Sequence, residues 1–121
     1  MKFKLLLFIL LKKMQGAAKK NPAFKKFIKD KNLKMNIKTA DNKNGRQYIF
    51  NNGKITSRSG VQEDSVMSMV WCDAETGFKT MSSPNEEAPV AALTEQKLVI
   101  EGKFKEFAWF SRSLDIMMGK A

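Results

Sequence analysis

The segment Gln47-Tyr-Ile-Phe-Asn-Asn-Gly-Lys-Ile-Thr-Ser-Arg58 decides how the middle of this 121-residue chain folds. Asn52-Gly53 separates two runs that favour β-strands, Gln47–Asn51 and Lys54–Arg58. An Asn-Gly pair between such runs is the strongest short-range signal for a β-hairpin, because its two-residue turn needs positive φ angles. The segment therefore predicts two antiparallel strands joined by a tight turn.

Strand patterns continue on both sides of this hairpin. Upstream, Leu33–Thr39 alternates apolar and polar residues and ends at the turn cluster Asp41–Gly45, which predicts an antiparallel meander of three strands. Downstream, Ser65–Cys72 predicts a fourth strand with apolar residues on both faces, which is typical of a central strand covered on both sides. Lys97–Glu101 predicts a fifth strand.

Helical patterns follow the fourth and fifth strands. Asp73 is placed as an N-cap for a helix in which apolar residues recur at positions 74, 78 and 81, although Gly77 lowers the expected stability of that helix. A short helix is predicted over Glu86–Thr94, with two glutamates at its positive end. A longer helix is predicted from Phe104 to about Met118, with apolar residues on more than one stripe.

The first 29 residues form a basic amphipathic segment that we separate from the domain at residues 30–121. Its apolar run, Leu5–Leu11, is too short to cross a bilayer. One interpretation is a signal peptide cleaved near Gly16-Ala-Ala18, although Lys12 and Lys13 before that point are atypical. The other is an amphipathic helix that packs on the domain or rests on a membrane. The residues at helical spacing are Phe3, Leu7, Leu10, Leu11 and Met14.

A second, short helix is predicted after Asn21-Pro22, where Phe24, Phe27 and Ile28 recur at helical spacing among lysines. For this helix we favour ordinary packing over membrane binding.

Positive charge is concentrated in the first half of the chain. The whole sequence has 22 basic and 12 acidic residues, and residues 1–60 hold 16 of the basic ones and 2 of the acidic ones. Such a half attracts phospholipid headgroups or nucleic acid, unless it is a solvated lysine face. Only three basic residues are Arg, which favours surface attraction over base recognition. The residues predicted to contact a membrane or a headgroup are Lys12, Lys13, Lys19, Lys20, Lys25 and Lys26.

The sequence lacks the residues that most enzyme and metal sites need. It contains no His, which excludes Ser-His and Cys-His nucleophiles and removes the commonest zinc ligand. Glycine-rich phosphate loops are also missing. The single cysteine, Cys72, cannot form an internal disulfide, and its place beside Trp71 predicts a buried packing residue. We therefore predict no catalytic residue, no metal and no cofactor.

Three stretches resemble the sterol carrier protein-2 family. The most specific is Ala88-Pro-Val-Ala-Ala-Leu-Thr-Glu-Gln-Lys-Leu-Val-Ile-Glu-Gly102, which is similar to the family's closing helix and strand. Asp73-Ala-Glu-Thr-Gly-Phe78 is similar to its acidic-start helix, and Gly45–Arg58 to its long hairpin. The resemblance covers about residues 30–118. Gln96 and Lys103 depart from the family pattern, which puts ligand entry and partner choice in doubt.

The resemblance implies an α+β fold with a five-stranded, mostly antiparallel sheet covered by helices, and a hydrophobic tunnel between them. It also implies non-catalytic binding, and transfer, of a fatty acyl chain, an acyl-CoA or a sterol-like lipid. The eight Met and nine Phe residues suit such a site, because Met side chains repack around varied shapes, although Met and aromatic stripes are more often plain core. The residues that we expect to contact lipid are Met67, Met69, Trp71, Phe78, Met81, Phe104, Phe107, Phe110, Leu114 and Met117.

Other partners and the location are left open by the sequence. The alternative function is a basic module that binds nucleic acid or protein, and the lack of aromatic residues interleaved with the basic ones counts against nucleic acid. An anionic membrane surface and a second copy of the chain are both compatible partners. We expect a cytoplasmic protein that associates peripherally with membranes, or an exported one if residues 1–18 are a cleaved signal.

Overall fold

The computed structural model describes residues 2–83 and 88–119, which form one five-stranded sheet with helices. The strand order is β3-β2-β1-β4-β5. The strands are β1 Asn32–Thr39, β2 Gly45–Asn51, β3 Lys54–Ser59, β4 Met67–Trp71 and β5 Leu98–Gly102. Each lies within two residues of its predicted position, and the predicted α+β class with a mostly antiparallel sheet is confirmed.

The hairpin predicted at Asn52-Gly53 joins β2 to β3. Both turn residues have positive φ angles, 49° at Asn52 and 90° at Gly53, as a two-residue hairpin turn requires. Residue pairing starts directly beside the turn, with Asn51 opposite Lys54. β1 pairs antiparallel with β2, so the predicted three-strand meander is confirmed.

β4 pairs in parallel with β1, on the side of β1 that faces away from β2. The chain must therefore cross from β3 at one edge to β4, and it does so over the sheet face that carries Asn36 and Gln47. The Asn36 side chain donates to the carbonyl of Gln62 (2.8 Å), and the Gln47 side chain donates to Asp64 Oδ1 (2.7 Å) and Ser65 Oγ (2.9 Å). Both Asn36 and Gln47 are buried, so these bonds fix the crossover on the sheet.

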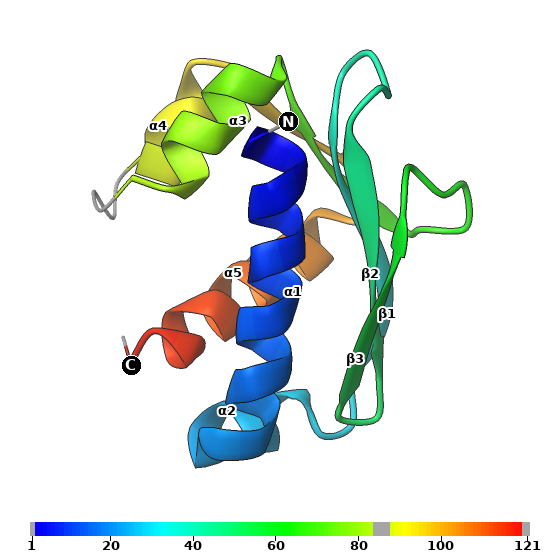
Figure 1. Cartoon of the computed structure of the whole chain (residues 1–121), viewed down its shortest axis with the longest axis vertical. Coiled ribbons are helices and arrows are strands. Elements are labelled where there is room, and N and C mark those ends of the chain that lie inside the picture. The colour runs from blue at the N-terminus through cyan, green and yellow to red at the C-terminus, as the bar shows by residue number, and fades with distance from the viewer. Residues whose placement is uncertain (1, 84–87, 120–121) are drawn as a thin grey trace.

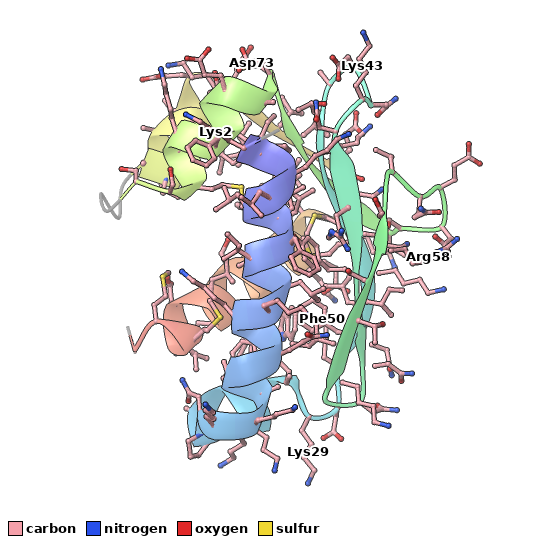
Figure 2. All side chains as sticks on the ribbon, viewed as in Figure 1. Lys2, Lys29, Lys43, Phe50, Arg58 and Asp73 are labelled. Atoms are coloured by element: carbon pink, nitrogen blue, oxygen red, sulfur yellow. The ribbon has the colours of Figure 1, made fainter. Side chains whose placement is uncertain are left out.

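The helices lie on the opposite face of the sheet (Figure 1). They are α1 Lys2–Lys20, α2 Pro22–Ile28, α3 Ala74–Met81, α4 Ala88–Thr94 and α5 Phe104–Met117. Figure 2 shows Phe50 between the sheet and the helices and Arg58 on the outer side. The core consequently lies in one layer, between the sheet and the helices.

Capping side chains explain where two helices begin. The Asn21 side chain accepts from the Phe24 N–H (3.1 Å), and Pro22 occupies the first turn of α2, where its missing N–H is harmless. The predicted cap of α3 is confirmed, because Asp73 Oδ1 accepts from the Thr76 N–H (2.7 Å).

The expectation that the fourth strand is covered on both faces is only partly correct. Val70 on the outer face is buried, but Val66 is 42% exposed and Cys72 is exposed. Both residues lie just beyond the ends of the strand, where their N–H groups still bond to the carbonyls of Lys34 and Lys97, so the outer face is uncovered at both ends of β4. Cys72 is therefore not the buried packing residue that was predicted. The start of the predicted helix Glu86–Thr94 lies outside the described residues.

Candidate functional site

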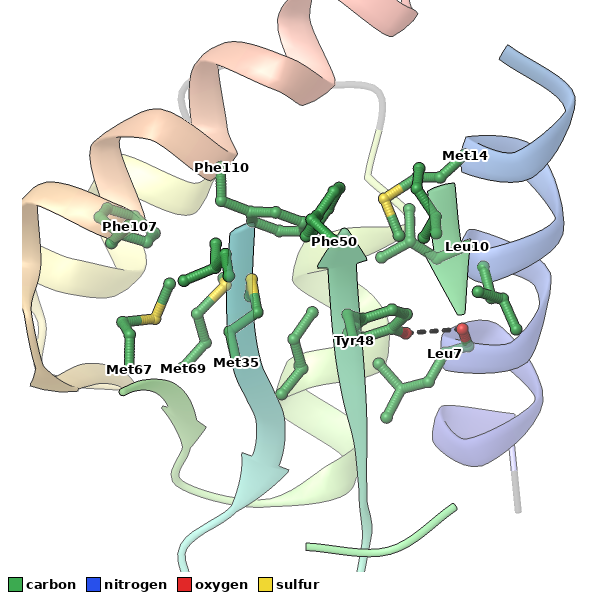
Figure 3. Close-up of a cluster of buried hydrophobic side chains, with 14 of the residues drawn as sticks. Leu7, Leu10, Met14, Met35, Tyr48, Phe50, Met67, Met69, Phe107 and Phe110 are labelled. Atoms are coloured by element: carbon green, nitrogen blue, oxygen red, sulfur yellow. Dashed lines mark hydrogen bonds between the residues drawn. The ribbon is translucent and has the colours of Figure 1, made fainter. Parts of the chain in front are cut away.

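A continuous layer of buried apolar side chains fills the space between the sheet and the helices (Figure 3). β1 and β4 contribute Met35, Met67 and Met69, and α5 contributes Phe107 and Phe110. Figure 3 shows these five side chains gathered on the same side of the sheet. The layer thus combines flexible thioethers with flat aromatic rings.

The structure brings most of the predicted lipid-contact residues into this layer. Five are buried, with 8% exposure or less: Met67, Met69, Trp71, Phe107 and Phe110. Four more are partly buried against the same cluster: Phe78, Met81, Leu114 and Met117. The exception is Phe104, which is 58% exposed, although its ring lies 5.4 Å from that of Phe107.

The N-terminal helix also belongs to this layer, although the sequence left open whether it packs on the domain and none of its residues was predicted to contact lipid. The five residues predicted to form the apolar stripe of α1 are all buried in the same cluster: Phe3, Leu7, Leu10, Leu11 and Met14. Tyr48 on β2 meets this helix, and its hydroxyl donates to the carbonyl of Leu7 (2.6 Å; Figure 3). Burial raises the pKa of Tyr48 well above its ordinary value, so the hydroxyl stays protonated. α1 is thus tied to the sheet by packing and by a hydrogen bond.

Trp71 lies on the sheet beneath the place where α1 and α3 meet. A Cβ atom at Gly77 of α3 would lie 2.7 Å from Phe3 Cε1 and 3.0 Å from Trp71 Cγ. A glycine is therefore needed at this position, which explains a residue that otherwise weakens the helix. Trp71 is 1% exposed, and its indole nitrogen has no hydrogen-bond partner among the residues that the structure describes.

Two hollows of the described chain lie on other parts of the surface. One is an open depression of about 300 Å³ lined by residues of β1 and β2 with Asp64 and Val66. The other, of about 540 Å³, lies beside the crossover segment near Asn36 and Lys38. Neither is lined by a predicted lipid-contact residue, so the tunnel between sheet and helices stays a prediction.

The predicted membrane-contact lysines lie at the surface. All six are exposed: Lys12, Lys13, Lys19, Lys20, Lys25 and Lys26. α1 and α2 contain no acidic residue, and among the described carboxylates none forms an ion pair with a lysine of these helices. Figure 2 shows nitrogen-tipped side chains extending from α2 at the same end of the molecule as Lys29.

Large apolar side chains accompany the lysines on the outer side of α1. Leu5 is 59% exposed, and Phe8 and Ile9 are each 41% exposed. These residues and Lys12 are separated by three or four positions, so they share one side of the helix. Lys12 Nζ lies 5.3 Å from the centre of the Phe8 ring. This outer face of α1, defined by Leu5, Phe8, Ile9, Lys12 and Lys13, combines exposed apolar surface with positive charge.

The described residues offer no cluster of carboxylate and thiol groups that could hold a metal ion. The exposed Cys72 thiol donates weakly to Asp73 Oδ2 (3.7 Å). Within residues 2–83 and 88–119, no helix has the length and apolar character needed to cross a membrane.

Comparison with known proteins identifies the fold. No protein-family profile and no curated protein sequence matches the chain. Among solved structures, the ubiquinone synthesis protein UbiJ-SCP2 aligns with a TM-score of 0.66 and 10% identity, over 93% of this chain and 98% of that protein. Sterol carrier protein 2 aligns with a TM-score of 0.57 and 13% identity, over 89% of this chain and 90% of that one.

Two further structures are similar to this chain over different shares of their length. TT1886 from Thermus thermophilus, described as possibly a sterol carrier protein, aligns with a TM-score of 0.57 and 13% identity, over 91% of this chain and 82% of its own. The sec-alkyl sulfatase PisA1 aligns with a TM-score of 0.52 and 16% identity, but over 66% of this chain. The chain spans 12% of that sulfatase's length. The chain therefore has a sterol carrier protein-2-like fold, as the resemblance in its sequence implied.

Proposed function

We propose that this protein binds a hydrophobic lipid between its sheet and its helices, without catalysing a reaction, and delivers it at membranes. The observation that carries this proposal is the buried layer of Met and Phe side chains in a sterol carrier protein-2-like fold. The names of the proteins with this fold, a sterol carrier and a ubiquinone synthesis protein, point to lipid handling in general. The lipid that we propose is a fatty acyl chain, an acyl-CoA or a sterol-like molecule.

Methionine gives this layer a way to accept a ligand. Met35, Met67 and Met69 lie side by side on adjacent strands, with Met35 opposite Met67 and Ile37 opposite Met69 in the register. Their unbranched side chains have three rotatable bonds each and can change shape without moving the sheet. Each methylene of a ligand taken out of water would contribute about 0.8 kcal/mol. An acyl chain could therefore offset the cost of repacking these residues.

The outer face of α1 is the part of the protein that we propose to dock on an anionic bilayer. Leu5, Phe8 and Ile9 would enter the boundary between headgroups and acyl chains, and the lysines of α1 and α2 would meet phosphate groups. The complementary charge favours a membrane of anionic lipids over a neutral one. Because the opposite side of α1 belongs to the core, we propose that the helix acts as part of the folded domain.

Ligand binding is tested most simply by the fluorescence of Trp71. A Trp109→Phe variant leaves Trp71 as the only tryptophan. Oleate, palmitoyl-CoA and cholesterol are then titrated separately. We expect at least one of them to change the emission of Trp71 with a saturable dependence on concentration. If none of the three does, and no lipid co-purifies with the protein, the lipid-binding proposal is wrong.

Docking is tested by flotation with vesicles. The protein should float with vesicles of phosphatidylcholine and phosphatidylglycerol and should remain below vesicles of phosphatidylcholine alone. Phe8→Ser and Ile9→Ser together should weaken flotation about tenfold, because each removes a partly exposed apolar side chain. Val90→Ser is the matched control, since Val90 on α4 is 64% exposed but lies outside α1. Equal losses in both variants, or binding to duplex DNA without binding to either vesicle, would contradict docking through α1.

A further inference from the structure

Trp71 carries a buried hydrogen-bond donor that the described residues leave unpaired. Its side chain is 1% exposed, and no described atom accepts from its indole N–H. The indole N–H of a buried tryptophan normally has a partner, because an unmade hydrogen bond in a low-dielectric interior is costly. One other buried side-chain atom of the described chain is unpaired, Gln47 Oε1, but it is an acceptor on the outer face of the sheet. Trp71 thus holds a donor inside the core that is free to meet a ligand.

The position of Trp71 suits the polar end of a lipid. Met67, Met69 and Trp71 alternate along β4, so their side chains lie on the same face, over about 13 Å of strand. The two methionines belong to the buried layer with Phe107 and Phe110. A chain lying along β4 would therefore have its tail against methionine and phenylalanine side chains and its head beside the indole.

The surroundings of Trp71 decide which kind of headgroup fits. Gly77 of α3 lies against both the Trp71 indole and the Phe3 ring of α1, since a Cβ atom on it would come 3.0 Å from Trp71 Cγ and 2.7 Å from Phe3 Cε1. The buried polar residues of the described chain are Asn36, Thr39, Gln47 and Ser113, and none of them is charged. A carboxylate or phosphate taken into this layer would have no buried cation to compensate it, which makes its burial very unfavourable. A neutral oxygen acceptor needs only one hydrogen-bond donor, and the indole N–H of Trp71 can supply it.

We propose that Trp71 Nε1 selects lipids that carry a neutral oxygen acceptor, such as a ketone, an ester or an ether, over plain hydrocarbon chains. The proposal rests on the lipid-binding function above and adds a specificity-determining residue to it. A lipid with an ionised head would bind with that head at the surface and would leave the indole unpaired.

The direct test follows the indole N–H by NMR. Protein labelled with ¹⁵N gives two indole resonances, and Trp109→Phe assigns them by removing one. The probes are 2-pentadecanone and pentadecane, each delivered from cyclodextrin. We expect the ketone to move the Trp71 indole proton downfield, as a new hydrogen bond does, and pentadecane to bind without that shift. Equal shifts with both probes, or binding of the ketone with no shift, would overturn the proposal.

A substitution measures the size of the effect. Trp71→Phe should reduce the affinity for 2-pentadecanone about five- to tenfold more than the affinity for pentadecane, the range expected for one neutral hydrogen bond. Trp109→Phe is the control and should leave the ratio of the two affinities as it is. An equal loss for both probes in Trp71→Phe would make Trp71 a wall residue only. If the wild-type protein binds neither probe but binds oleate, palmitoyl-CoA or cholesterol, this proposal fails and the lipid-binding function stands. If Trp71→Phe does not fold, the NMR shifts of the wild-type protein still decide the question.

Discussion

The two sides of α1 differ in how far their apolar residues are exposed to solvent. The inner side buries Phe3, Leu7, Leu10, Leu11 and Met14 against the sheet. The outer side leaves Leu5, Phe8 and Ile9 exposed and continues into exposed lysines. Both sides are apolar over the first half of the helix, so hydrophobicity alone does not separate them. The difference shows that one helix can complete a core and still present a surface suited to an anionic membrane.

The largest expected effect comes from a pair of leucine substitutions that compares the two sides directly. Leu7→Ala should lower the free energy of unfolding by roughly 2–5 kcal/mol, because Leu7 is 1% exposed and its loss leaves a cavity beside Tyr48. Leu5→Ala is the matched control and should change it by about 0.5 kcal/mol or less. Urea unfolding of the two variants measures the difference. Similar values for both would mean that α1 is not held on the sheet as described.

A smaller effect is expected where α3 meets the inner side of α1. Gly77→Ala should improve the intrinsic helix preference of α3 by up to about 1 kcal/mol. The added methyl group would be pushed against Phe3 and Trp71, however, and overpacking of this kind costs about 1–3 kcal/mol. We therefore expect a net loss of stability, together with a changed Trp71 emission. A gain in stability with unchanged emission would show that α1 and α3 are packed less closely.

The smallest effect concerns the outer face of the sheet, where the crossover is held by Asp64. Hydrogen bonds from Gln47 and Lys34, with the positive charge of Lys34, hold the pKa of the Asp64 carboxyl below its ordinary value of 3.8. A lowered pKa in the folded state means that Asp64 contributes stability above its unfolded pKa and loses it as the pH falls through the folded pKa. The wild-type protein and Asp64→Asn should thus differ in stability above about pH 5 and converge in acid. Thermal unfolding of both proteins across this pH range measures the difference in stability. A difference that does not depend on pH would contradict the stabilising role of the Asp64 carboxylate.

Local sequence signals predicted the elements well, since each depends on a few neighbouring residues. The Asn52-Gly53 turn, the Asp73 cap and the Asn21-Pro22 boundary were all found in this way. The parallel pairing of β1 with β4 was not predicted, because the crossover is held by long-range bonds from Asn36 and Gln47 that leave no periodic pattern.

The candidate site was only partly predictable, because it too depends on contacts between residues far apart in the sequence. Alternation along β4 placed Met67, Met69 and Trp71 on one face, and the structure confirms that all three are buried. Phe104 begins α5 at the surface, which its hydrophobicity could not reveal. Whether the indole N–H of Trp71 finds a hydrogen-bond acceptor depends on the atoms that surround the indole. This is a property of the packing and not of the sequence pattern.

Native mass spectrometry of the freshly purified protein, followed by organic extraction, tests the central claim most directly. If the layer between the sheet and the helices holds a lipid, a fraction of the protein should be heavier than the 13.7 kDa chain by the mass of one lipid, and extraction should release and identify that lipid. An unliganded mass that stays unchanged after incubation with acyl chains and sterols would contradict the account. The Met and Phe residues would then be core alone.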